Sequence, residues 1–174
     1  MRAILIINKT RDYLDYLEEH INNVQKAFKE IEIKCKDMRF ITDDLFYHTL
    51  HAEVERHDLS KLSEYEFIQY RKAFFPVDGD PKYDMSEAWE HHKTMNPHHW
   101  ENWTSQTGCK IHPDDWEIDC AHMVIDWMAM GYKFGDTAKE YYETNKDRIK
   151  LPPIAIFFIY EIFKRIEPEY KEFN

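Results

Sequence analysis

The sequence predicts an all-α fold, and two observations carry this prediction. Only four glycines and seven prolines occur among the 174 residues, so long stretches contain no residue that readily ends a helix. Within those stretches, apolar residues recur three and four positions apart, which places them on one face of a helix. Hydrophobic residues make up 43% of the chain, enough for a buried core. We therefore expect one domain over residues 1–174, a compact bundle of about seven helices.

Three helices are expected in the first half of the chain. The first covers about 10–33, where apolar residues and one histidine share a face. The second covers about 43–56, with Thr42 or Asp43 as its cap. The third covers 63–75 and is stopped by a proline.

Four more helices are expected after the Gly- and Pro-containing loop at 76–84. The first covers 86–95. The second runs from a cap at Asp114 or Asp115 to Met130 and ends at Gly131. The third has Asp136 or Thr137 as its cap and covers 138–149, and the fourth starts at Pro152 and Pro153. The step from Asn96 to Pro97 should break or kink the first of these, because proline disfavours a helical residue before it.

Charge and cysteine content exclude several classes of protein. The net charge is −10, and such an acidic chain is poorly suited to general nucleic-acid binding, which needs clustered lysine and arginine. Three cysteines without a C-x-x-C pair predict a reducing cytoplasm rather than a disulfide framework. The N-terminal apolar run is too short for a signal peptide. The apolar stretch at 151–163 predicts a buried helix rather than a membrane span, and it could also form an interface between copies of the chain.

The main chemical motif is His57-Asp58, followed three residues later by Lys61. Imidazole and carboxylate together suit a borderline divalent metal ion. A His-Asp dipeptide alone means little, because chance supplies many of them.

Two further residues strengthen the motif. His20 lies on the apolar face of the first expected helix, and Asp126 lies among apolar residues such as Trp127. A carboxylate in such a position needs a partner, because an unpaired buried charge is costly. His20 could instead be a core histidine bonded to a carbonyl, and Asp126 could form a buried salt bridge. Together with the His-Asp pair, they would supply two histidines and two aspartates from three helices.

This order of residues resembles the HD-domain superfamily of metal-dependent phosphohydrolases. The matching residues are His20, the HDLSK segment at 57–61, and Asp126. Three longer segments, at 57–70, 88–103 and 123–146, are similar to a family of small phage and bacterial proteins of unknown function.

The resemblance implies an HD-like helical domain and a cytoplasmic phosphohydrolase that acts on a small phosphate ester, a nucleotide above all. His20, His57, Asp58 and Asp126 would ligate a divalent ion: Mn, Fe, Co, Ni, Zn and Mg are not distinguished. Water activated by the metal would attack the ester, with Asp58 and Lys61 as the catalytic residues. Lys61 would hold a phosphate oxygen and neutralise charge in the transition state.

The remaining histidines are candidates for a second ion or a phosphate contact. His91 and His92 point about 100° apart on a helix, so only one of them should face a given site. By analogy with superfamily members that carry extra histidines, we choose one from each adjacent pair, His92 and His99. The other members, His91 and His98, stay possible.

His122 stands where the resembled family usually has an acidic residue one turn before the last aspartate. Its spacing from Asp126 is i, i+4, so the two share a helix face. His122 could ligate, could orient Asp126, or could simply pack.

Two alternatives to the phosphohydrolase remain open. An HD scaffold with extra histidines could hold two irons and act as an oxygenase. The chain could also be a non-catalytic phage or host interaction protein that uses metal for stability.

Overall fold

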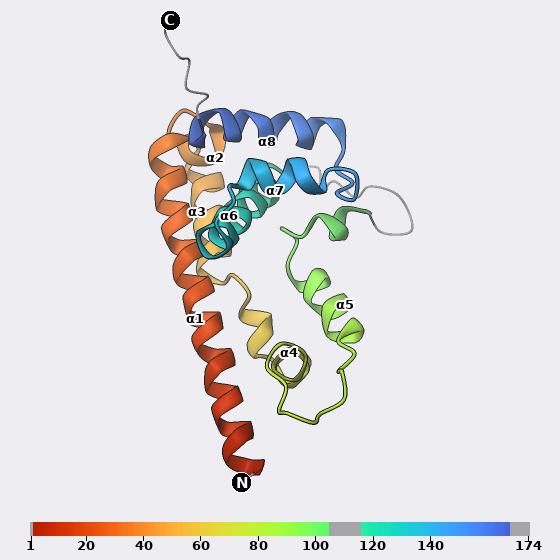
Figure 1. Cartoon of the computed structure of the whole chain (residues 1–174). Helices are drawn as coiled ribbons and strands as arrows, with labels where there is room; N and C mark the ends of the chain where they lie inside the picture. The colour runs from red at the N-terminus through yellow and green to blue at the C-terminus, as the bar shows by residue number, and fades with distance from the viewer. Residues whose placement is uncertain (1, 105–115, 168–174) are drawn as a thin grey trace, which may run out of the picture. The chain divides into compact units, whose positions relative to one another are not determined.

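The computed structural model describes residues 2–104 and 116–167, and it confirms the all-α fold (Figure 1). The described residues form eight α-helices and two 3-10 helices, with no strand among them. In chain order the elements are α1 (Arg2–Lys34), α2 (Arg39–Thr42), α3 (Asp44–Glu55), η1 (Leu59–Leu62), α4 (Phe67–Phe74), α5 (Ser86–Met95), η2 (Trp100–Thr104), α6 (Trp116–Phe134), α7 (Ala138–Asn145) and α8 (Pro153–Ile166).

Several predicted boundaries are confirmed by their capping chemistry. Asp43 caps α3, because its carboxylate accepts hydrogen bonds from the backbone N–H groups of Leu45 and Phe46 at 3.1 and 3.2 Å. Thr137 caps α7 in a capping box with Glu140. Pro153 begins α8, where its fixed φ suits the first helical turn and its missing N–H costs nothing.

Other boundaries differ from the prediction. α1 begins at Arg2 rather than near residue 10, and the single turn of α2 was not expected. α4 begins at Phe67 rather than Ser63, because η1 and a turn occupy the preceding residues. α6 continues past Gly131 to Phe134 and ends before Gly135, which has φ +90°. The expected caps Asp114 and Asp115 lie outside the described residues.

The described residues group into two compact units. The first unit comprises residues 2–22 and 57–96, and the second comprises 23–56 and 97–167. α1 therefore contributes its first part to one unit and its remainder to the other. The single domain over 1–174 stays a prediction.

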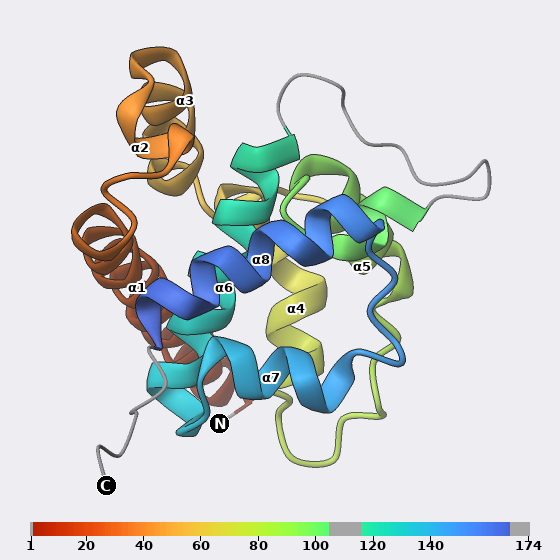
Figure 2. The same ribbon diagram turned by 90° about the horizontal axis from the view of Figure 1, so that it is seen from above.

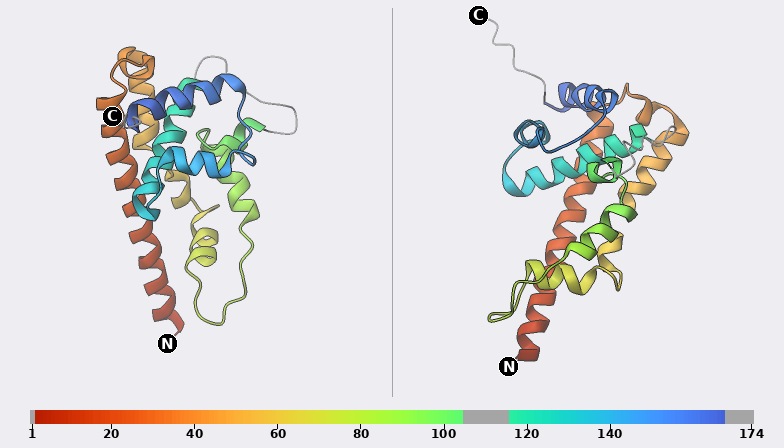
Figure 3. Two further views of the ribbon diagram at one scale, coloured as in Figure 1. Left: turned by 45° about the horizontal axis from the view of Figure 1, so that its top comes forward. Right: turned by 90° about the vertical axis from the view of Figure 1, so that its right-hand side faces the viewer.

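The first unit has a small aromatic core. Tyr13 and Leu17 of α1 are buried with Tyr70 of α4 and Ala88 of α5. The ring of Tyr13 meets that of Phe67 edge-on, with centroids 5.3 Å apart. An extended segment joins α4 to α5 (Figure 3). This core fixes α1, α4 and α5 around the turn that carries the His-Asp pair.

The second unit is built around α6. Eleven residues of α6 are buried, and the helix packs against α3, α7 and α8. α7 and α8 lie side by side (Figure 2). The apolar C-terminal stretch is confirmed as a core helix, since five residues of α8 are buried. None of the helices in the described part of the chain is long and apolar enough to cross a membrane.

Candidate metal centre

A left-handed turn presents the His-Asp pair. Asp58 has φ 58° and ψ 13°, and it is the one non-glycine residue with positive φ in the described ranges. Aspartate tolerates this conformation better than most residues, although it still costs free energy. The turn separates α3 from η1 and buries both side chains, with His57 3% and Asp58 2% exposed. The strained backbone conformation therefore lies where the side chains of the His-Asp pair are buried together.

Three potential ligand atoms converge in the first unit. Nε2 of His20 lies 3.0 Å from Nε2 of His57 and 3.4 Å from Oδ2 of Asp58. Nε2 of His57 lies 3.5 Å from the same Oδ2. Metal bonds of about 2.1 Å place neighbouring ligand atoms about 3.0 Å apart in an octahedron and about 3.4 Å apart in a tetrahedron. The triangle therefore has the dimensions of one face of a metal coordination shell.

The chemistry of the triangle also fits a cation. A neutral imidazole has one bare nitrogen, and an ionised carboxylate only accepts hydrogen bonds. Lone pairs that converge in a buried place need a proton or a cation between them. His20, at 5% exposure, is as buried as the other two.

Lys61 supplies a positive charge beside the triangle. Its Nζ lies 2.5 Å from Oδ2 of Asp58, and its side chain is only 15% exposed. Burial alone would raise the pKa of the Asp58 carboxyl. The charges of Lys61 and His57, and hydrogen bonds from His20 and His57, outweigh burial and hold that pKa well below its usual range. Asp58 is therefore ionised, as a carboxylate that could hold a metal ion must be.

The second oxygen of Asp58 faces another histidine. Oδ1 lies 3.2 Å from Nε2 of His92, which is fully buried. Of the first histidine pair, the structure thus brings His92 to Asp58. Nδ1 of His91 lies instead 2.6 Å from Glu66, and its ring stacks on Tyr65.

Glu66 is a buried residue beside His91 and His92 that no motif of the sequence marks. It is 0% exposed, and its two oxygens meet Nδ1 of His91 at 2.6 Å and Nδ1 of His92 at 2.9 Å. Ser60 donates to the same carboxylate at 3.1 Å. Glu64 and Glu66 look alike in the sequence, and an acidic residue before a helix has the ordinary explanation of favouring its N-terminus. The sequence therefore held no distinguishing signal.

Asn96 explains how the end of α5 is held. As expected, the helix stops before Pro97, and Asn96 is its C-cap. Its side-chain amide donates to the carbonyl of His92 at 2.7 Å and to Oγ of Ser60 at 2.9 Å. These bonds tie the last turn of α5 to η1.

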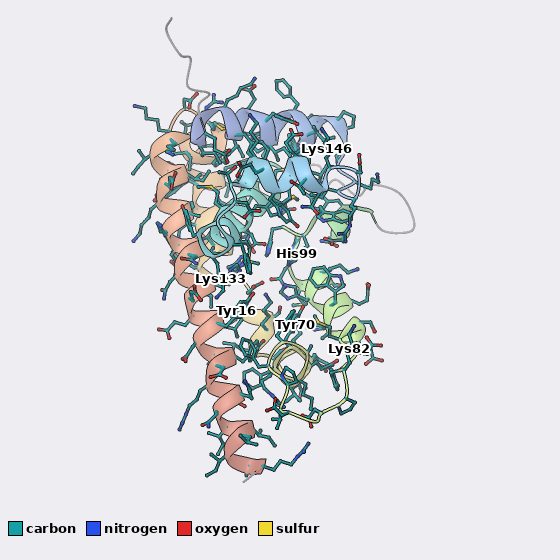
Figure 4. The ribbon with its side chains drawn as sticks, in the orientation of Figure 1. Tyr16, Tyr70, Lys82, His99, Lys133 and Lys146 are labelled. Atoms are coloured by element: carbon teal, nitrogen blue, oxygen red, sulfur yellow. The ribbon has the colours of Figure 1, made fainter. Side chains whose placement is uncertain are left out.

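The second unit has its own histidine–carboxylate group. One ligand atom from each of His98, His99 and Asp126 lies within 4.8 Å of the others. The ring of His98 also packs against that of His122, with centroids 4.2 Å apart, and both residues are buried. Figure 4 labels His99 of this unit, and Tyr70 on α4 of the first. Two predictions about the site stay predictions. One is that Asp126 ligates the same ion as His20, His57 and Asp58, and the other is that His99 acts with His92.

The chain is thus an all-α protein whose buried imidazoles and carboxylates could hold a metal ion. Residues 9–164 match the family of unknown function DUF5662, and the chain belongs to this family. A search of curated proteins and a search of solved structures gave no match.

Proposed function

We propose that the protein is a metal-dependent phosphohydrolase of the HD type that acts on a small phosphate ester, with a nucleotide as the favoured substrate. The observation that supports it best is the buried triangle of His20, His57 and Asp58, with edges of 3.0, 3.4 and 3.5 Å. Lys61 beside this triangle adds the cation that phosphate chemistry requires.

Each residue has a defined part in this proposal. His20, His57 and Asp58 would hold the divalent ion, and the HD resemblance adds Asp126 as a fourth ligand. A bound divalent ion makes water nucleophilic near neutral pH and polarises a phosphoryl oxygen. Lys61 would bind a phosphate oxygen and offset the charge that develops there. The fixed left-handed turn at Asp58 orients the carboxylate before substrate arrives.

The overall charge favours a small substrate. The chain has 33 acidic and 23 basic residues, so a nucleic-acid polymer would be repelled over most of its length. A single phosphate ester needs only a local cation such as Lys61.

The test is phosphate release from a panel of nucleotides and sugar phosphates with added Mn²⁺, Co²⁺ or Mg²⁺. Wild type should release phosphate, and Asp58→Asn should lose at least about 100-fold in rate with loss of bound metal. Asp78→Asn, an exposed aspartate of the same unit, should behave as wild type. Protein that binds no divalent ion and releases no phosphate from any member of the panel would contradict the proposal.

A di-iron oxygenase is the second candidate. It is favoured by one observation: Asp58 directs Oδ2 toward His20 and His57 but Oδ1 toward His92. A carboxylate shared in this way suits two ions rather than one. Two irons per chain with oxygen-dependent absorbance would support it, and a single bound ion would argue against it. Metal that stabilises the protein without any turnover would support a non-catalytic interaction protein.

A further inference from the structure

The N-terminal part of α1 carries an apolar stripe that the core of the first unit does not cover. Ile4, Ile7 and Leu14 are 64%, 50% and 42% exposed. Their spacing of three and then seven residues is that of the contact positions in a coiled coil. Tyr13 and Leu17, which are buried in the core, lie on another side of the helix. α1 therefore has two apolar faces in this part, and only one of them is buried.

The first two turns of α1 are apolar on every side. Residues 4–7 read Ile-Leu-Ile-Ile, and all four side chains are exposed. These turns extend past α4 (Figure 1, Figure 3). Isolated apolar residues at a surface are ordinary, but a contiguous exposed group of them marks a site of contact.

Two charged residues continue the stripe. At the same spacing, the next contact positions are Arg11 and Glu18, which are exposed, and the half-buried Ile21. A polar residue at such a position lowers the stability of a helix pair but specifies how the two helices align. In a parallel pair of copies, Arg11 would face Arg11 and Glu18 would face Glu18, and like charges repel. In an antiparallel pair centred between residues 12 and 13, the long side chain of Arg11 would reach Glu18 of the other copy.

The charges along the helix favour the same arrangement. Residues 2–11 hold three basic residues and no acidic one, whereas residues 12–22 hold four acidic residues and neither lysine nor arginine. An antiparallel pair lays the basic half of each copy along the acidic half of the other, but a parallel pair lays like charge on like charge. The face is therefore complementary to itself only when the second copy runs in the opposite direction.

Ion pairs within the chain leave the middle of this face unmatched. Arg2 and Lys9 each pair with an aspartate at the surface. Arg11, Asp15 and Glu18, by contrast, form no ion pair among the residues that the structure describes. A two-fold symmetric pair would match these charges at both ends, because each contact occurs twice.

We propose that this face of α1 binds a second copy of the chain as an antiparallel helix pair. The contacts, each made twice, are Ile4 against Ile21, Ile7 against the stem of Glu18, and Arg11 against Leu14. One helix face is small for a permanent dimer, so association depends on protein concentration. The contact uses none of the proposed metal ligands, and its test does not depend on the proposed activity.

Sedimentation equilibrium over a range of protein concentrations measures the association. Wild type should move from 21.3 kDa toward twice that mass. Ile7→Asp places a charge against Glu18 of the other copy and should raise the dimer Kd at least about 10-fold. Phe157→Asp is the matched control, because Phe157 is an exposed apolar residue of α8 in the other unit, and it should associate as wild type does. Wild type that stays monomeric, or a dimer lost in Phe157→Asp but kept in Ile7→Asp, would overturn the proposal.

Charge reversal tests the orientation of the pair. Arg11→Glu and Glu18→Arg should each weaken the dimer, and the double variant should dimerise more tightly than either single variant. Both residues are exposed, so all three variants should fold, which circular dichroism checks. A double variant no tighter than the single ones would overturn the antiparallel pair. A monomer that instead sediments with anionic lipid vesicles would place a lipid surface on this face and overturn it equally.

Discussion

At the scale of single residues, Tyr70 is a tyrosine whose buried hydroxyl lowers the stability of the fold. Its hydroxyl is buried and has no hydrogen-bond partner within the described ranges. Burial and the nearby Glu66 and Asp58 carboxylates raise its pKa, so it stays a protonated donor. An unsatisfied buried hydroxyl costs about 1–3 kcal/mol. Tyr70 lies on α4 (Figure 4) and its ring packs edge-on against His92.

Tyr70→Phe should therefore be at least as stable as wild type, with a gain of up to about 1 kcal/mol in the free energy of unfolding. Urea unfolding followed by circular dichroism measures this. Tyr13→Phe is the matched control, because the hydroxyl of Tyr13 already donates to the carbonyl of Lys61 at 3.4 Å. A loss of more than about 1 kcal/mol in Tyr70→Phe would show that the hydroxyl does have a stabilising partner.

At the same scale, the sequence revealed part of the candidate site but not all of it. The His-Asp dipeptide and the apolar setting of His20 led to three residues that the structure places within hydrogen-bonding range of one another. The helix period of 100° indicated that only one of His91 and His92 would face a given site, and His92 contacts Asp58 while both rings contact Glu66. Glu66 was missed, because only tertiary structure places a glutamate from the start of α4 beside α5.

At the scale of elements, capping chemistry could be recognised from the sequence because it is local. Asp43 and Thr137 satisfy N–H groups two or three residues away, so residue type and spacing are sufficient. Gly131 was misread as a helix end because its role is not local. A Cβ there would lie 2.2 Å from the carbonyl oxygen of Asp136. Glycine at 131 thus permits a close approach, and Gly135 with φ +90° follows the last residue of the helix.

Gly131→Ala should consequently destabilise the protein, although alanine favours helices by about 1 kcal/mol over glycine. The clash is with backbone, which cannot swing aside, so we expect a net loss of about 1–3 kcal/mol. Thermal unfolding measures it. Gly79→Ala provides a comparison without a clash, since nothing lies within 4 Å of a Cβ there and only its φ of +83° opposes the change. A Gly131→Ala protein as stable as wild type would refute this role.

At the scale of the whole molecule, the buried carboxylates make stability depend on pH. The pKa values of Asp58 and Glu66 in the folded protein lie below their ordinary values of 3.8 and 4.5. The unfolded chain therefore binds protons at a higher pH than the folded chain does. Their contribution to stability is complete above about pH 4.5 and is lost as the pH falls through the folded values. His92 has the opposite sign, since its pKa is raised by Asp58 and Glu66 against the effect of burial, and its contribution is lost as the pH rises.

The metal-free protein should thus lose unfolding free energy as the pH falls below about 4.5, measured by urea titration at each pH from about 6 down to about 3. Glu66→Gln should be less stable at pH 6 but should show a shallower decline, because one of the titrating groups is gone. Acids at the surface also have lowered pKa values, Asp37 through a hydrogen bond from Arg165 and Glu161 through hydrogen bonds from Lys164 and Arg165. These exposed pairs contribute little to stability, so Asp37→Asn should leave the slope nearly unchanged. An equal flattening in both variants would place the acid sensitivity on the surface rather than in the buried network.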